Sequence, residues 1–282
     1  MVSTGARVST RLCSVGVLGL ERLRKAGCGT VLAVFDRSLY LADASGHLMC
    51  LLGPAAEAGP LHLVAQTDFD CRSVAVATRW QLRRHCLCLG SLQFDLSEAE
   101  VWSPDKVDLS QNTSPIDVAQ LLRDAPADSA AHAYLGNADI TQPVDWRRVA
   151  MPILRGLEDW IVGRSSRPDI TQLVGLGPGL TPSGDDLLGA MLITLHTTGQ
   201  QQLCESLSSD VSALLARTHP ISAAHLDAAL CGQGTAALHA VVAALVSSGR
   251  LPAELRARLV ALGARSGWEM LLGVIIVLQA SS

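Results

Sequence analysis

Two adjacent carboxylates, Asp185 and Asp186, directly follow a run rich in glycine and proline. The run holds Gly175, Gly177, Gly179 and Gly184 together with Pro178 and Pro182. Glycine permits a positive φ and a close approach of the backbone to a ligand, while proline stiffens its neighbours. The apolar run 184–197 predicts a helix, and free N–H groups at a helix N-terminus bind anions, phosphate especially. The segment 175–186 therefore indicates a phosphate-type site, whose carboxylates are suited to hold Mg²⁺ or to act as a general base.

The spacing within this run excludes three familiar motifs. The dinucleotide-binding pattern G-x-G-x-x-G fails because Leu180 or Pro182 stands where its last glycine is needed. Gly179 and Gly184 have the separation found in a nucleotide P-loop, but Asp185 occupies the position of its lysine. A serine-hydrolase elbow fails because Thr181, not glycine, lies two residues before Ser183.

The same residues also fit a purely structural role. Ser183 at a helix N-cap would accept a backbone N–H, and Asp186 three residues on would reach back to the cap. Asp185 and Asp186 both suit the positive end of the helix dipole. This interpretation accounts for the three side chains and leaves the surrounding glycines and prolines unexplained, so both interpretations stay open.

One later segment resembles part of this run, and a second adds polar residues at another predicted helix start. Ser266–Glu269 repeats the pattern of Ser183–Asp186, because each precedes an apolar helix and carries an acid. If this sequence similarity is meaningful, the two helix starts with their acidic side chains face one pocket. The segment 218–232 adds Ser222 and His225 at another predicted helix start, where His225 is either a ligand or a satisfied buried histidine.

Other groups carry weaker signals for chemistry. His85, Cys86 and Cys88 invite a zinc interpretation, but no second pair of cysteines or histidines completes a tetrahedral set, so no metal ligands are predicted. The eight cysteines show no disulfide framework, which favours a reduced, cytoplasmic protein. The net charge of -4 gives no sign of a basic surface for binding nucleic acid. The apolar run Met270–Leu278 is too short for a membrane span.

The hydrophobic pattern divides the chain into two units of different class. Short β-prone runs, suggestive of a small barrel or curled sheet, occur at 31–35, 38–42, 47–52, 61–66, 83–89, 91–96 and 100–102. Helical periodicity follows, at 115–123, 144–162, 184–197, 201–217, 221–231, 235–247, 252–262 and 267–279, and Pro152 should kink or split the second of these. We predict an α+β protein with a β-rich, barrel-like unit over 1–110 and a helical unit over 111–282.

The run from Gly175 to Gly189 resembles the signature of the oxamate carbamoyltransferase subunit AllH family. Three further stretches are similar to that family: Ala58–Pro60, the group Thr218, Ile221, Ser222 and Gly232, and Ser266–Leu271, where we expect aspartate instead of Glu269. The resemblance implies a subunit of a carbamoyltransferase complex in purine (allantoin) breakdown, associated with oxamate, oxalurate, phosphate and carbamoyl phosphate. It also implies other subunits as partners, with a small phosphate or carboxylate ligand.

The resemblance and the residue patterns together give one hypothesis for the site. Asp185 and Asp186 are the catalytic candidates, which orient an amine or a metal such as Mg²⁺. The ligand-binding candidates are Gly177, Gly179, Thr181, Ser183, Gly184, Ser222, Ser266, Gly267 and Glu269. Because no lysine follows Lys106, a cationic partner in the helical unit must be arginine, and the candidates are Arg155, Arg164, Arg167, Arg217 and Arg265. A non-catalytic assembly subunit and a stand-alone binder or enzyme of other chemistry are the alternatives.

Overall fold

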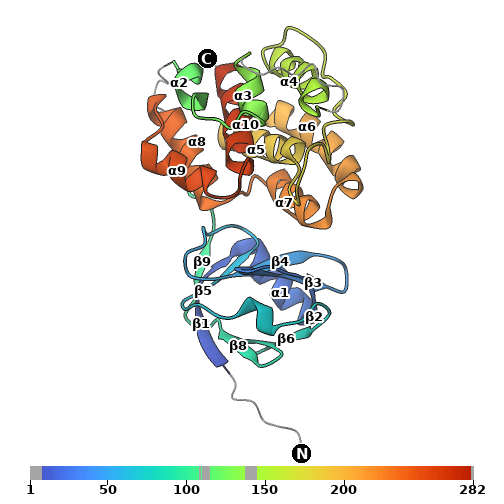
Figure 1. The fold of residues 1–282 in the computed structure, drawn as a ribbon, viewed down its shortest axis with the longest axis vertical. Helices are drawn as coiled ribbons and strands as arrows, with labels where there is room; N and C mark the ends of the chain where they lie inside the picture. Colours follow the sequence, from blue (N-terminus) through green and yellow to red (C-terminus); the bar gives the residue numbers. More distant parts are fainter. Residues whose placement is uncertain (1–7, 108, 110–114, 137–144, 281–282) are drawn as a thin grey trace, which may run out of the picture. The chain divides into compact units, whose positions relative to one another are not determined.

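The computed structural model describes residues 8–107, 109, 115–136 and 145–280. Contacts between Cα atoms divide the chain into two compact units, Met1–Pro104 and Asp105–Ser282. The described strands lie in the first unit, and all the described helices except α1 (Val17–Ala26) and a single 3-10 turn lie in the second (Figure 1). The predicted class, a β-rich barrel unit followed by a helical unit, is confirmed.

The first unit is a closed β-barrel. Its strands are β1 (Val8–Gly16), β2 (Cys28–Val34), β3 (Ser38–Asp43), β4 (Leu48–Leu52), β5 (His62–Ala65), β6 (Arg79–Arg83), β7 (Cys86–Leu89), β8 (Leu92–Asp95) and β9 (Glu100–Trp102). Among the described residues the strand order is β5-β4-β3-β2-β6-β7-β8-β1-β9. A further antiparallel pairing between β1 and β5 closes eight of these strands on themselves. Closure leaves few exposed strand edges, and Trp80 and Phe94 fill the interior.

Two features of the barrel were not predicted from the sequence. Strand β1 and helix α1 lie before the first predicted strand, and β1 pairs in parallel with β8 and antiparallel with β5. The single run predicted at 83–89 is instead a hairpin, in which β6 ends at Arg83 and β7 begins at Cys86. Arg84 adopts a positive φ of 55° in the turn, a conformation that the sequence pattern did not indicate because arginine rarely takes it.

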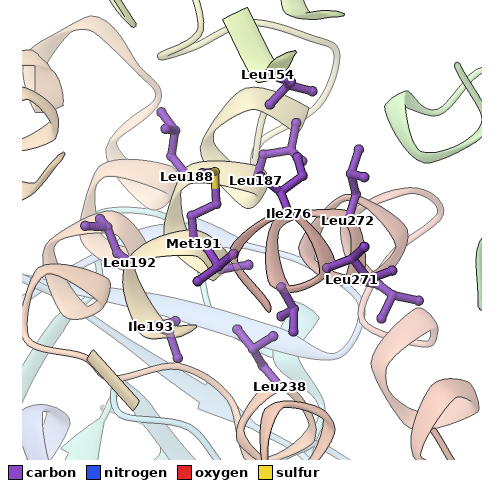
Figure 2. Packing of buried hydrophobic residues seen from close by; sticks show 14 of the residues in the cluster. Leu154, Leu187, Leu188, Met191, Leu192, Ile193, Leu238, Leu271, Leu272 and Ile276 are labelled. Atoms are coloured by element: carbon purple, nitrogen blue, oxygen red, sulfur yellow. The ribbon is translucent and has the colours of Figure 1, made fainter. Parts of the chain in front are cut away.

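The second unit is built of helices around two buried ones. They are α2 (Val118–Leu122), α3 (Ala130–Tyr134), α4 (Arg147–Ile161), α5 (Ser183–Thr197), α6 (Gln201–Leu214), α7 (Pro220–Leu230), α8 (Ala236–Ser248), α9 (Ala253–Val260) and α10 (Ser266–Ala280). Every residue of α5 from Ser183 to Leu195 is buried, as is α10 from Leu271 to Leu278. Leu187 and Met191 of α5 lie close to Ile276 of α10 in the core (Figure 2). Helices that are apolar all round belong in such a core.

Close approach of α5 and α10 depends on glycine. A Cβ added to Gly273 of α10 would lie 2.6 Å from the carbonyl oxygen of Leu187 on α5, well inside contact distance. The absence of a side chain there lets the two backbones touch. This contact sets the N-terminal ends of the two helices, Ser183 and Ser266, at a fixed spacing within the unit.

Of the expected kink or split at Pro152, the split is not present. Helix α4 runs without interruption from Arg147 to Ile161 with Pro152 inside it. Proline costs one backbone hydrogen bond there, and the burial of Ala150, Leu154 and Leu157 holds the helix in place. In the described part of the chain, no helix combines the length and the apolar character needed to cross a membrane.

Candidate functional site

The glycine-rich run forms a looped turn that leads into α5. The N–H of Leu176 donates to the carbonyl of Leu173 (3.1 Å), and the N–H of Gly184 donates to the carbonyl of Leu176 (2.9 Å). Gly177 and Gly179 have φ values of 107° and 105°, which side-chain-bearing residues rarely adopt. Between these anchors the loop folds back on itself and places its tip at the start of the buried helix.

The predicted cap by Ser183 is wrong. Helix α5 begins at Ser183, with Pro182 at the N-cap position and no side-chain capping bond. The carbonyl of Pro182 accepts the N–H groups of Asp185 (2.9 Å) and Asp186 (3.1 Å). Because Ser183 is already inside the first turn, its hydroxyl is not placed to cap that turn, and Asp186 has no cap to reach back to.

Asp185 instead connects three segments of the helical unit. One oxygen, Oδ1, accepts the N–H of Gly175 at 2.8 Å. The other, Oδ2, accepts the hydroxyl of Ser222 at 2.6 Å and the hydroxyl of Thr218. The side chain is 3% exposed. Asp185 therefore holds the glycine-rich loop, α5 and the start of α7 together, and the structure brings the predicted site residue Ser222 into this group.

Asp186 lies one residue further and is bound far less completely. It is 7% exposed, and its Oδ2 has no hydrogen-bond partner among the described residues. Burial raises the pKa of Asp186 well above its usual range, against the smaller lowering effects of the Ser266 and Thr181 hydroxyls, and the nearby carboxylates Asp185 and Glu269 raise it further. The hydroxyls of Thr181 and Ser266 are 3.1 Å apart. A carboxyl group of this kind is suited to donate a proton or a hydrogen bond.

Glu269, on the first turn of α10, caps another helix. Its Oε1 accepts the N–H of Ala130 at 2.9 Å and its Oε2 accepts the N–H of Ala131 at 3.3 Å, at the start of α3. Burial raises the pKa of Glu269 to about 7, although these two N–H groups and Arg265 oppose the shift. Both oxygens are thus used within the fold. Nothing in the sequence near residue 130 links it to residue 269.

Two of the predicted ligand-binding glycines serve close packing. A Cβ on Gly184 would lie 1.9 Å from the carbonyl oxygen of Leu173, and one on Gly267 would lie 2.2 Å from that of Leu259. Neither position has room for a side chain. Gly179, in contrast, has room for a side chain, because the atom nearest to an added Cβ is the carbonyl oxygen of Thr181 at 3.9 Å.

The tip of the loop offers unused backbone donors. Within the described part of the chain, the N–H groups of Gly177, Gly179, Leu180 and Thr181 have no hydrogen-bond partner. Leu180 is 42% exposed, so the tip faces solvent. Together with the N-terminal end of α5, these donors form an environment that favours an anion.

Residues 173–278 match the family model described as oxamate carbamoyltransferase subunit AllH. The resemblance read from the glycine-rich run is confirmed. The AllH match begins at Leu173, the residue whose carbonyl anchors the loop, and ends within α10, so it spans less than half of the chain. No curated protein and no solved structure matches the chain.

Of the five arginines predicted as anion partners, Arg217 and Arg265 lie within residues 173–278, and the other three precede this segment. Arg155, Arg164, Arg167 and Arg265 form ion pairs with Glu158, Asp159, Asp210 and Asp128, respectively. Arg217 forms no ion pair within 4 Å among the described residues, although its charge helps to lower the pKa of Asp169. Its backbone carbonyl oxygen would lie 2.9 Å from a Cβ on Gly175. Arg217 is therefore the predicted arginine that is next to the loop and has no ion pair.

The described residues contain no group of three or more histidine, cysteine, aspartate or glutamate side chains placed to hold a metal ion. Cys86 and Cys88 of β7 do lie together, with their sulfur atoms 3.7 Å apart, and both thiols are free.

Proposed function

We propose that this protein is a subunit of a carbamoyltransferase complex that interconverts oxamate plus carbamoyl phosphate with oxalurate plus phosphate, in purine (allantoin) breakdown. The AllH match over residues 173–278 supports the class of enzyme. We also propose that the two units are separate domains and that the loop of the helical domain binds the phosphate-type group. The observation that carries this proposal is the set of unpartnered N–H groups at the loop tip, next to the N-terminus of α5.

The proposed roles divide between backbone and side chains. The free N–H groups of Gly177, Gly179, Leu180 and Thr181 bind the phosphate-type ligand, and Arg217, whose backbone lies beside Gly175, supplies positive charge. Asp185 positions the loop through its three hydrogen bonds. Asp186, with the hydroxyls of Thr181 and Ser266, is the polar group that meets the reacting part of the ligand. During carbamoyl transfer a C–N bond to the acceptor forms, the C–O bond to phosphate breaks, and the proton lost by the acceptor nitrogen ends on the released phosphate. The loop N–H groups stabilise the charge that develops on this leaving phosphate.

A second candidate is an assembly subunit without catalytic groups. The use of all four oxygens of Asp185 and Glu269 inside the fold favours it, because residues bound in this way act as structural joints. In that case the glycine-rich loop joins α5 and α7, and partner subunits supply the chemistry. The two candidates differ in whether the chain binds phosphate by itself.

Isothermal titration calorimetry of the chain with phosphate and with carbamoyl phosphate, with and without Mg²⁺, tests the loop site. We expect Gly179→Ala to weaken binding at least about tenfold, because a residue with a side chain cannot keep the φ of 105° that orients the neighbouring N–H groups. Gly199→Ala is the matched control, since Gly199 also has a positive φ, 69°, and open space around it.

The outcomes separate the candidates. Binding that is lost in Gly179→Ala and kept in Gly199→Ala supports the loop site. Binding that is equal in both variants contradicts it. If neither ligand binds the wild-type chain, while the chain still assembles with the other subunits, the assembly role is favoured.

A further inference from the structure

A cavity separate from the glycine-rich loop lies in the helical unit. It has a volume of about 540 Å³, within the range of small-molecule sites, and is formed by α2 and the turn between α8 and α9. Leu121 and Leu251 provide apolar surface. None of the residues singled out for the loop site lines it.

Three arginines line this cavity: Arg123, Arg250 and Arg256. Arg256 is held in place, because its Nη1 lies 3.0 Å from Asp124 and its guanidinium lies over the ring of Trp268, 5.9 Å from the centroid. Arg250 has no acidic partner among the described residues. Arg256, which is held by Asp124 and Trp268, and Arg250, which has no ion pair among the described residues, thus line the same cavity.

Backbone donors add to the positive character of the cavity. Helix α9 begins at Ala253, which lines the cavity, and it has no side-chain cap. In its first turn only the N–H of Arg256 is bonded, to the carbonyl of Pro252. Free N–H groups and the helix dipole at this end favour negative charge. The one acid that lines the cavity, Asp117, is already engaged by the N–H of Gln120 at 3.0 Å.

We propose that this cavity is a second binding site, which takes a small organic dianion bearing carboxylate or phosphate groups. The guanidinium groups of Arg250 and Arg256 bind the charged groups, because the planar fork of arginine matches carboxylate and phosphate oxygens. Leu121 and Leu251 pack against the carbon skeleton of the ligand. This site does not depend on the carbamoyltransferase assignment.

Calorimetric titration with succinate and with glycerol 3-phosphate, two organic dianions, at constant ionic strength tests the proposal. We expect at least one of them to bind, and Arg250→Gln to weaken that binding about tenfold or more. Arg250 is exposed, so the variant keeps its fold. Arg164→Gln is the matched control, because Arg164 is an exposed arginine outside the cavity that pairs only loosely with Asp159, at 3.7 Å.

A second readout identifies which site is occupied. Because Arg256 lies over Trp268, ligand binding in the cavity should change the fluorescence of that indole, and Trp268→Phe should remove the change. Gly179→Ala should leave both the affinity and the fluorescence change intact. The proposal is overturned if neither probe binds at millimolar concentration, if Arg164→Gln weakens binding as much as Arg250→Gln, or if Gly179→Ala abolishes it.

Discussion

Replacing Asp185 with alanine is expected to lower the free energy of unfolding by about 3–5 kcal/mol. The substitution leaves three donors without their acceptor: the N–H of Gly175 and the hydroxyls of Thr218 and Ser222. The site is buried, so water does not replace the lost bonds at full strength. Urea unfolding followed by circular dichroism measures the change.

Two further variants show whether the hydrogen bonds are the cause. Asp185→Asn keeps one oxygen for Gly175 and can donate to a hydroxyl, so a smaller loss is expected than for alanine. Asp169→Ala is the matched control, because Asp169 also accepts a loop N–H, from Thr171 at 2.8 Å, but it is not buried. A loss for Asp185→Ala that is no larger than for Asp169→Ala would show that the connection between the three segments does not stabilise the fold.

The stability of the protein is expected to fall by about 3 kcal/mol, through Glu269 alone, as the pH rises from about 4.5 to about 7. Burial raises the pKa of Glu269 from 4.5 to about 7, so the folded state holds a proton that the unfolded state has released. Stability is therefore fully present below the unfolded pKa and is lost as the pH rises through the folded one. The raised pKa of Asp186 has the same sign.

The difference between wild type and Glu269→Gln isolates this contribution. Burial lowers the pKa of His239 to about 4, so that residue acts in the opposite direction, and its effect cancels in the difference. Arg265 and Asp128 also act on Glu269 and remain in both proteins. Urea unfolding at a series of pH values should give a flatter profile for Glu269→Gln. An unchanged slope would mean that Glu269 does not carry a raised pKa.

The sequence by itself determined the division into a barrel and a helical unit, and the place of the glycine-rich loop. Hydrophobic residues recur every two positions in a half-buried strand and about every 3.6 positions in an amphipathic helix. These patterns are local, so they locate strands and helices without knowledge of the fold. Gly232 and Gly249 follow α7 and α8 with φ values of 70° and 64°, a conformation that glycine adopts readily where helices end. The glycine-rich loop could also be located from the sequence, because a positive φ is a property of a single residue and glycine adopts it most readily.

Tertiary structure decided what the side chains of the site do. Glu269 caps residues more than a hundred positions away in the chain, at Ala130 and Ala131, and Asp185 reaches Ser222 across two helices. Strand β1 is a strand because β5 and β8 lie beside it. The arginine-lined cavity likewise exists only where α2 meets the α8–α9 turn. Such pairings depend on how the chain packs, since hydrogen bonding and burial join residues by distance in space and not by distance along the sequence.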